Sequence, residues 1–172
     1  KDVFKALNES IANEVSPQHI LQALKLLLAA LVKNTAAPRP SPQSMQDLRK
    51  NLEQMLSSDE EFTRRNAAQV TGYYCELASE DDVKDLIGDV MIDLADSDWP
   101  SLQSGLWVVG YTLTTVPASL LYLHQRFMPY VTVALRHKTA QVRQAACFVL
   151  EAVLSAKLEG SQAEDVMHLV ES

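Results

Sequence analysis

The chain has 172 residues, of which 47% are hydrophobic but only 6% aromatic, and its formal net charge is −7. This length suffices for one domain with a sizeable core, and the acidic balance argues against a general binder of nucleic acid or of anionic membranes. The longest apolar stretch, Ile20–Val32, is interrupted by Gln22 and Lys25 and falls short of the roughly 18 residues of a membrane span, which indicates a buried helix. Because the sequence opens with Lys-Asp and no methionine, we expect a segment of a longer protein.

Helix signals follow one another along the chain, and strand signals are almost absent. Ser58 with Glu61 has the spacing of a capping box, and Ser79 with Asp82 marks another helix start. The segment Asn34–Ser44 contains three prolines and no apolar periodicity, which is typical of a linker. We expect helices at about 2–14, 17–33, 42–56, 60–78, 80–95, 100–115, 118–137 (broken near Pro129), 139–157 and 162–170.

A pattern in the first half of the chain recurs in the second half. Arg64 and the alanine pair that follows it match Arg143 and the Ala-Cys pair that follows it, at an offset of two units of about 39 to 40 residues. Gly72 and Gly110 then occupy the same repeat position. In the middle unit, Gly105 stands where we expect a small residue to touch a neighbouring second helix.

A period of about 40 residues built from two helices is typical of HEAT repeats. One hairpin leaves part of its apolar stripe open, and a stacked neighbour buries it. We therefore predict an all-α fold, a HEAT-type α-solenoid of about four helical-hairpin repeats; an isolated helical bundle is the alternative. Residues 1–172 would form a single solenoid fragment, with units at approximately 1–33, 42–78, 80–115 and 118–157, the start of a further unit at 161–172, and a linker at 34–44.

The two matching arginines stand where such repeats place an arginine that binds an acidic turn. Asp59 could serve Arg64, whereas the Arg-His-Lys turn before Arg143 has no acid. In the middle unit Leu102 takes the place of the arginine. We therefore expect the first turn to follow the pattern and the other two units to depart from it.

Residues that could carry chemistry are dispersed. Asp81, Asp85 and Asp89 lie on one helix face opposite the apolar stripe, which indicates a solvated surface that could attract a basic partner. The four histidines fall in separate units, and the sequence has neither a glycine-rich phosphate loop nor a serine elbow. We expect no enzyme, no metal, no cofactor and no small-molecule ligand.

The two cysteines, Cys75 and Cys147, are far apart and each lies in an apolar helical run. Without a CxxC spacing, they are interpreted as buried thiols of a protein in a reducing compartment. This interpretation predicts a cytoplasmic location.

A candidate protein-binding surface comes from aligning the second helices of three units. Equivalent positions of a solenoid line up on one surface, and aromatic residues with arginine are typical of protein-binding hot spots. We expect Trp107 to be half-exposed there; if the helices are rotated, the rings belong to the core instead. The predicted surface comprises Arg65, Gln69, Tyr73, Gln103, Trp107, Tyr111, Gln144 and Phe148.

Three stretches resemble, in order and spacing, the C-terminal HEAT-repeat region of the family of general-control translational activators. They are "ILQALKLLLAA", "MLSSDEEFTRRNAAQVTGYYCELASEDDVKDLI" and "DWPSLQSGLWVVGYTL". The similarity covers roughly residues 16–116, with weaker repeat similarity to Ala156. The family consists of ribosome-associated scaffolds that activate the kinase of translation initiation factor 2 during amino-acid starvation.

The resemblance implies a protein-docking segment in or near the part of the scaffold that holds the RWD domain of that kinase, with the ribosome engaged through the larger scaffold. It assigns no kinase-contacting residue to this sequence. One alternative is a HEAT-repeat adaptor of another cytosolic complex, such as a transport or phosphatase scaffold. Another is an RNA or ribosome contact, for which the chain offers a basic cluster of Arg126, Arg136, His137, Lys138 and Arg143.

Overall fold

The computed structural model describes residues 17–34, 36, 39–96, 98–116 and 120–159, together with Ala6 and Glu9. These residues contain helices and no strand, which confirms the all-α class for the described part of the chain. The expected helices at 2–14 and 162–170 lie outside the described residues, except for Ala6 and Glu9, which are helical. The helices are α2 (Pro17–Lys33), α3 (Pro42–Leu56), α4 (Glu61–Leu77), α5 (Glu80–Asp96), α6 (Trp99–Thr115), α7 (Leu120–Ala134) and α8 (Ala140–Glu159), close to the expected bounds.

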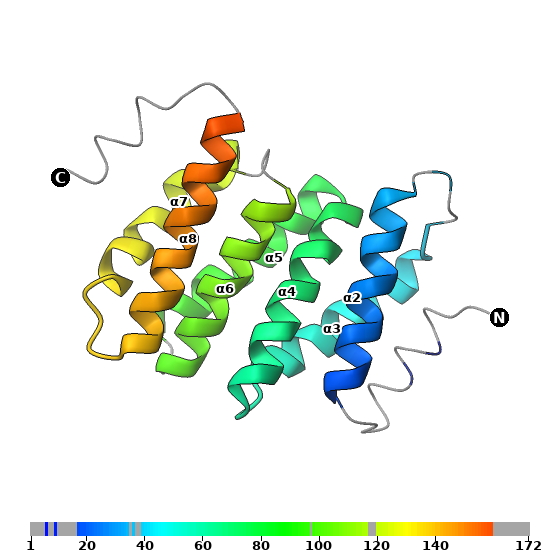
Figure 1. The fold of residues 1–172 in the computed structure, drawn as a ribbon, viewed down its shortest axis with the longest axis horizontal. Coiled ribbons are helices and arrows are strands. Elements are labelled where there is room, and N and C mark those ends of the chain that lie inside the picture. The colour runs from blue at the N-terminus through cyan, green and yellow to red at the C-terminus, as the bar shows by residue number, and fades with distance from the viewer. Residues whose placement is uncertain are drawn as a thin grey trace.

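The helices form two layers (Figure 1). Helices α2, α4, α6 and α8 lie side by side in this order, and α3, α5 and α7 form the second layer, where each packs against the helix that follows it in the chain. The core lies between the layers and includes fully buried side chains such as Leu28, Ile87, Leu113, Phe127 and Val149. Each helical pair therefore completes its apolar packing against the next pair.

Glycines set the distance between neighbouring helices of the first layer. A Cβ atom at Gly72 of α4 would lie 2.9 Å from the backbone oxygen of Tyr111 in α6, and one at Gly110 of α6 would lie 2.5 Å from Cε1 of Phe148 in α8. The Thr115 hydroxyl donates a hydrogen bond of 2.7 Å to the Gly72 carbonyl at the first contact. The two positions that share a place in the predicted repeat thus both face the next first-layer helix, Gly72 against its backbone and Gly110 against a side chain.

The expectation for Gly105 is wrong. This residue is buried on the side of α6 that carries Ser101, Ser104 and Val108, and together they line a cavity toward α3 and α5. The close contacts between first-layer helices are made instead by Gly72 and Gly110. The sequence pattern identified the correct helix but not which of its small residues faces a neighbour.

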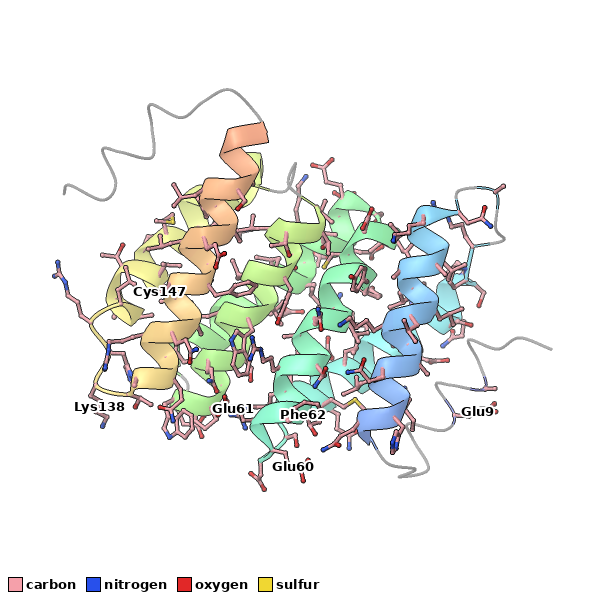
Figure 2. All side chains as sticks on the ribbon, viewed as in Figure 1. Glu9, Glu60, Glu61, Phe62, Lys138 and Cys147 are labelled. Atoms are coloured by element: carbon pink, nitrogen blue, oxygen red, sulfur yellow. The ribbon has the colours of Figure 1, made fainter. Side chains whose placement is uncertain are left out.

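The turns before α4 and α8 are held in the same way, at the same edge of the molecule, near the labelled Glu60 and Lys138 (Figure 2). Nη1 of Arg64 donates to the carbonyls of Ser58 and Asp59 at 2.9 and 3.0 Å. Nη1 of Arg143 donates to the carbonyls at the corresponding positions of its own turn, His137 and Lys138, at 2.7 and 2.9 Å.

The expected acidic partner is therefore wrong, because both arginines bind backbone carbonyls and not a carboxylate. Every residue has a backbone carbonyl, whatever its side chain. The Arg-His-Lys turn can therefore accept hydrogen bonds from Arg143 just as the turn at Asp59 accepts them from Arg64. In the middle unit Asp98 caps α6 instead and accepts a hydrogen bond of 3.2 Å from the backbone N–H of Ser101.

One of the two helix starts expected from paired side chains needs correction, and the other does not. The capping box of Ser58 and Glu61 does not form, because α4 begins two residues later than that box requires, with Glu60 as N-cap and no side-chain cap bond. The helix start expected at Ser79 and Asp82 is confirmed, because α5 begins at Glu80 and the backbone N–H of Asp82 donates to the hydroxyl of Ser79.

The expected break near Pro129 is also wrong, because α7 continues through this residue. Its ring lies on the exposed side of the helix. At an exposed position, water can satisfy the carbonyl that loses its helical partner to proline.

Burial follows the predicted face of α5 but not the predicted state of both cysteines. Asp81, Asp85 and Asp89 are exposed and Ile87 is buried.

Cys75 is buried, whereas Cys147 is exposed on α8, which corrects the expectation of two buried thiols. Judged by length and hydropathy, no helix among the described residues could cross a bilayer.

Candidate protein-docking surface

The candidate surface is the outward side of the first helical layer, and the sequence of α4 shows how it is positioned. Ala67, Val70 and Tyr74 of α4 are buried against the core. Arg65 lies on the other side of the helix and is exposed. The helical period therefore directs the polar and aromatic stripe outward, as the sequence predicts.

Between α4 and α6, the guanidinium of Arg65 contacts the ring of Trp107 and the hydroxyl of Tyr111. Its Cζ lies 5.9 Å from the ring centroid of Trp107, within the range of a cation–π contact. Its Nε donates a long hydrogen bond of 3.5 Å to the hydroxyl of Tyr111. This arginine therefore acts as a bridge that orders the outward faces of two neighbouring helices.

Between α6 and α8, the bridge is aromatic. The ring centroids of Tyr111 and Phe148 lie 4.8 Å apart with an interplanar angle of 58°, a tilted pair of the kind aromatic rings prefer. The contact lies beside Gly110, whose missing side chain leaves room for the Phe148 ring. Arg65, Trp107, Tyr111 and Phe148 thus form one connected cluster across three helices, as expected.

Between α2 and α4, two polar contacts continue the same surface, and sequence reasoning missed them. The Lys25 ammonium donates to Oε1 of Gln69 at 2.8 Å, and Nε2 of Gln22 donates to Oδ1 of Asn66 at 3.1 Å. The signal was present, because Gln22 and Lys25 are the polar residues that interrupt the apolar run of α2. A polar pair in such a run indicates the side that faces away from the core.

The expected exposure of Gln103 and Trp107 is wrong. Both lie on the predicted side of α6, but Gln103 is 1% exposed and Trp107 is 6% exposed. Oε1 of Gln103 accepts a hydrogen bond of 3.0 Å from Nη2 of the buried Arg64, and the guanidinium of Arg65 covers Trp107. The physical reason is the close approach of α4 at Gly72, which places its arginines over the neighbouring helix.

The part of the predicted surface that a partner can reach is smaller than expected, and we call it the docking face. Arg65 and Gln144 are exposed, whereas Gln69, Tyr73, Tyr111 and Phe148 are half-buried. The Tyr73 side chain packs partly against the core. The docking face comprises Arg65, Gln69, Tyr73, Tyr111, Gln144 and Phe148.

The ionisable groups with perturbed pKa values near α4 owe the shift to burial. Burial raises the pKa of the Cys75 thiol to about 12, partly opposed by a hydrogen bond from the Thr112 hydroxyl. Burial, followed by the charge of Asp82, raises the pKa of Tyr74. These groups belong to the packing of α4 against its neighbours. Among the residues that the structure describes, no cluster of His, Cys, Asp or Glu could hold a metal ion.

The predicted basic cluster is brought together only in part. Arg136, His137 and Lys138 line a shallow cavity at the end of α7. Arg143 is turned toward the carbonyls of its own turn, and Arg126 is exposed earlier on α7, outside the residues that line this cavity. The predicted cluster is therefore divided, because Arg143 binds the backbone of its own turn while Arg136, His137 and Lys138 lie together at the surface.

Comparisons with known proteins give no family assignment. A scan against protein-family models found no match to the chain, and a search of curated proteins found none either.

Proposed function

We propose that the chain is a HEAT-type α-solenoid segment that docks a partner protein on the docking face. The repeated features support this architecture. Gly72 and Gly110 each make a close contact with the next first-layer helix, and Arg64 and Arg143 bind the carbonyls at corresponding positions of their turns. First-layer helices that lie side by side present equivalent residues on one continuous surface, which is how solenoids build extended binding sites.

The observation that carries the docking function is the connected chain of side chains from Arg65 through Tyr111 to Phe148. Tyrosine and arginine are enriched among residues that dominate protein–protein binding energy. Their mutual contacts hold them in place before a partner arrives, which lowers the entropy lost on binding. The net charge of −7 favours a protein over an RNA partner for this face.

We propose as partner the RWD domain of the kinase of translation initiation factor 2, on the strength of the sequence resemblance. In this proposal the segment belongs to a cytoplasmic translational-control scaffold. It would hold the kinase near ribosomes when amino acids are scarce, and its contribution to activation would be proximity. The docking face would provide a rigid surface and no chemical group that reacts.

A pull-down with the isolated RWD domain tests the partner and the face together. The variant Arg65→Glu removes the bridge between α4 and α6 and reverses an exposed charge on the docking face. Lys50→Glu makes the same change of charge at an exposed position of α3, in the second layer. We expect wild type and Lys50→Glu to retain the RWD domain and Arg65→Glu to lose most of it.

The possible failures have different meanings. If wild type captures no RWD domain, the proposed partner is wrong, and a HEAT-repeat adaptor of another cytosolic complex becomes the better proposal. If Arg65→Glu binds as well as wild type while its melting temperature is unchanged, the partner stands but the docking face is wrong.

A further inference from the structure

A cavity of about 310 Å³ lies between α3, α5 and α6, in a part of the molecule separate from the docking face. Its apolar wall includes Leu56, Leu86 and Val108, and Gly105 of α6 also lines it. Pockets for drug-sized ligands span roughly 300–1,000 Å³. This cavity is at the lower limit, so it suits one long side chain better than a larger molecule.

The polar groups of the cavity all offer acceptors. Ser57, Ser101 and Ser104 line it, and the Ser104 hydroxyl already donates its proton to the Pro100 carbonyl at 3.0 Å. The hydroxyl of Ser57 likewise donates to the Glu53 carbonyl at 3.4 Å. These hydroxyl oxygens keep their lone pairs for a donor, and a group rich in N–H donors is the matching ligand.

Two carboxylates, those of Glu53 and Asp89, stand at the cavity, and they already bind one guanidinium. Oε1 of Glu53 accepts from Nε of Arg49 at 2.9 Å, and Oδ2 of Asp89 accepts from Nη2 of the same arginine. The pair carries two negative charges against one positive charge, and each carboxylate uses one oxygen for Arg49. Exposed Asp85 lies one helical turn before Asp89 and adds negative potential.

We propose that this cavity is a second docking site, which receives an arginine side chain from a partner protein. The apolar wall would hold the methylene stem, while the serine oxygens and the remaining carboxylate oxygens would accept from the guanidinium. Arginine fits better than lysine because its planar head offers five donors and is more weakly hydrated than an ammonium. The site is independent of the RWD partner proposed above, because it lies on the side of α6 that faces the second layer.

The test is an NMR titration of the 172-residue chain with the peptide acetyl-Ser-Arg-Ser-amide. The matched control replaces arginine by citrulline, which keeps the shape and removes the charge. We expect the arginine peptide to shift the backbone amides of Ser57, Asp89 and Gly105, and the citrulline peptide to leave them in place. Equal shifts with both peptides would overturn the proposal.

Variants separate the cavity from a general attraction to negative charge. Glu53→Gln with Asp89→Asn removes two carboxylates at the cavity and should weaken binding about tenfold, since a charge-assisted hydrogen bond contributes about that factor. Asp81→Asn with Glu151→Gln removes the same charge at exposed positions of α5 and α8 that do not line the cavity, and should leave the affinity unchanged. If both pairs weaken binding equally, the attraction is nonspecific and the proposal is wrong.

A third variant tests the shape of the site. Gly105→Leu places a side chain into the cavity and should abolish the shifts at Ser57 and Asp89. If this variant folds and still binds the arginine peptide as wild type does, the peptide does not enter the cavity. If it does not fold, the two carboxylate variants decide the question.

Discussion

Replacing Gly72 by alanine tests the close contact between α4 and α6. The new Cβ would lie 2.9 Å from the backbone oxygen of Tyr111, whereas ordinary contacts begin near 3.4 Å, so the two helices must separate. Overpacking of this kind costs about 1–3 kcal/mol, and the better helix propensity of alanine returns at most about 1 kcal/mol. We expect a net destabilisation of about 1–2 kcal/mol, or about 2–8 °C in melting temperature for a chain of this size.

Gly88 provides the matched control, because the same substitution there meets no atom within 4 Å. Gly88→Ala should therefore show only the gain in helix propensity and stabilise the protein by about 0.5–1 kcal/mol. Thermal melts followed by circular dichroism give the sign of each change directly. If Gly72→Ala raises the melting temperature as Gly88→Ala does, the close approach of α4 and α6 is wrong.

Further predictions concern burial. Trp107→Ala should cost about 3–5 kcal/mol in urea unfolding, as for a core aromatic; unchanged stability would place its ring at the surface. Native protein should react with one equivalent of iodoacetamide, at Cys147, and a second equivalent would contradict the burial of Cys75. Burial raises the pKa of Cys75 from 9.0 to about 12. The thiol of the unfolded chain therefore loses its proton first, and the free energy of unfolding falls as pH rises through this window. Cys75→Ala should make this fall with pH shallower, and an unchanged pH dependence would refute this cause. Arg64→Met should destabilise more than Arg143→Met, because only Arg64 is buried; equal unfolding midpoints would argue against its buried bonds.

Helix positions could be predicted because their signals are local. The bond between Ser79 and Asp82, the proline that opens α3 and the apolar stripe of α5 are readable within one turn or two. The equivalence of Gly72 and Gly110 came from the repeat offset, and their contacts agree with it. Signals that act within one helix are therefore readable from the sequence, because they do not depend on how the helices pack.

The exposure of Trp107 could not be predicted, because it depends on a neighbouring helix. The helical period predicted correctly on which side of α6 the Trp107 side chain lies, but the arginine that covers its ring comes from α4. The same reason applies to Gly105, whose surroundings are set by α3 and α5. The cavity that it lines has no sequence signature at all, since its wall combines three helices.

Alkylation of Cys147 in the presence of the RWD domain tests the docking function most directly. Cys147 is exposed on α8 (Figure 2), one residue before Phe148 of the docking face in the sequence. Lys50→Cys adds a reference thiol at an exposed position of α3 in the second layer. A saturating RWD domain is predicted to slow alkylation at Cys147 and to leave the rate at the reference position unchanged. An unchanged rate at Cys147 in a complex that has demonstrably formed would contradict docking on this face.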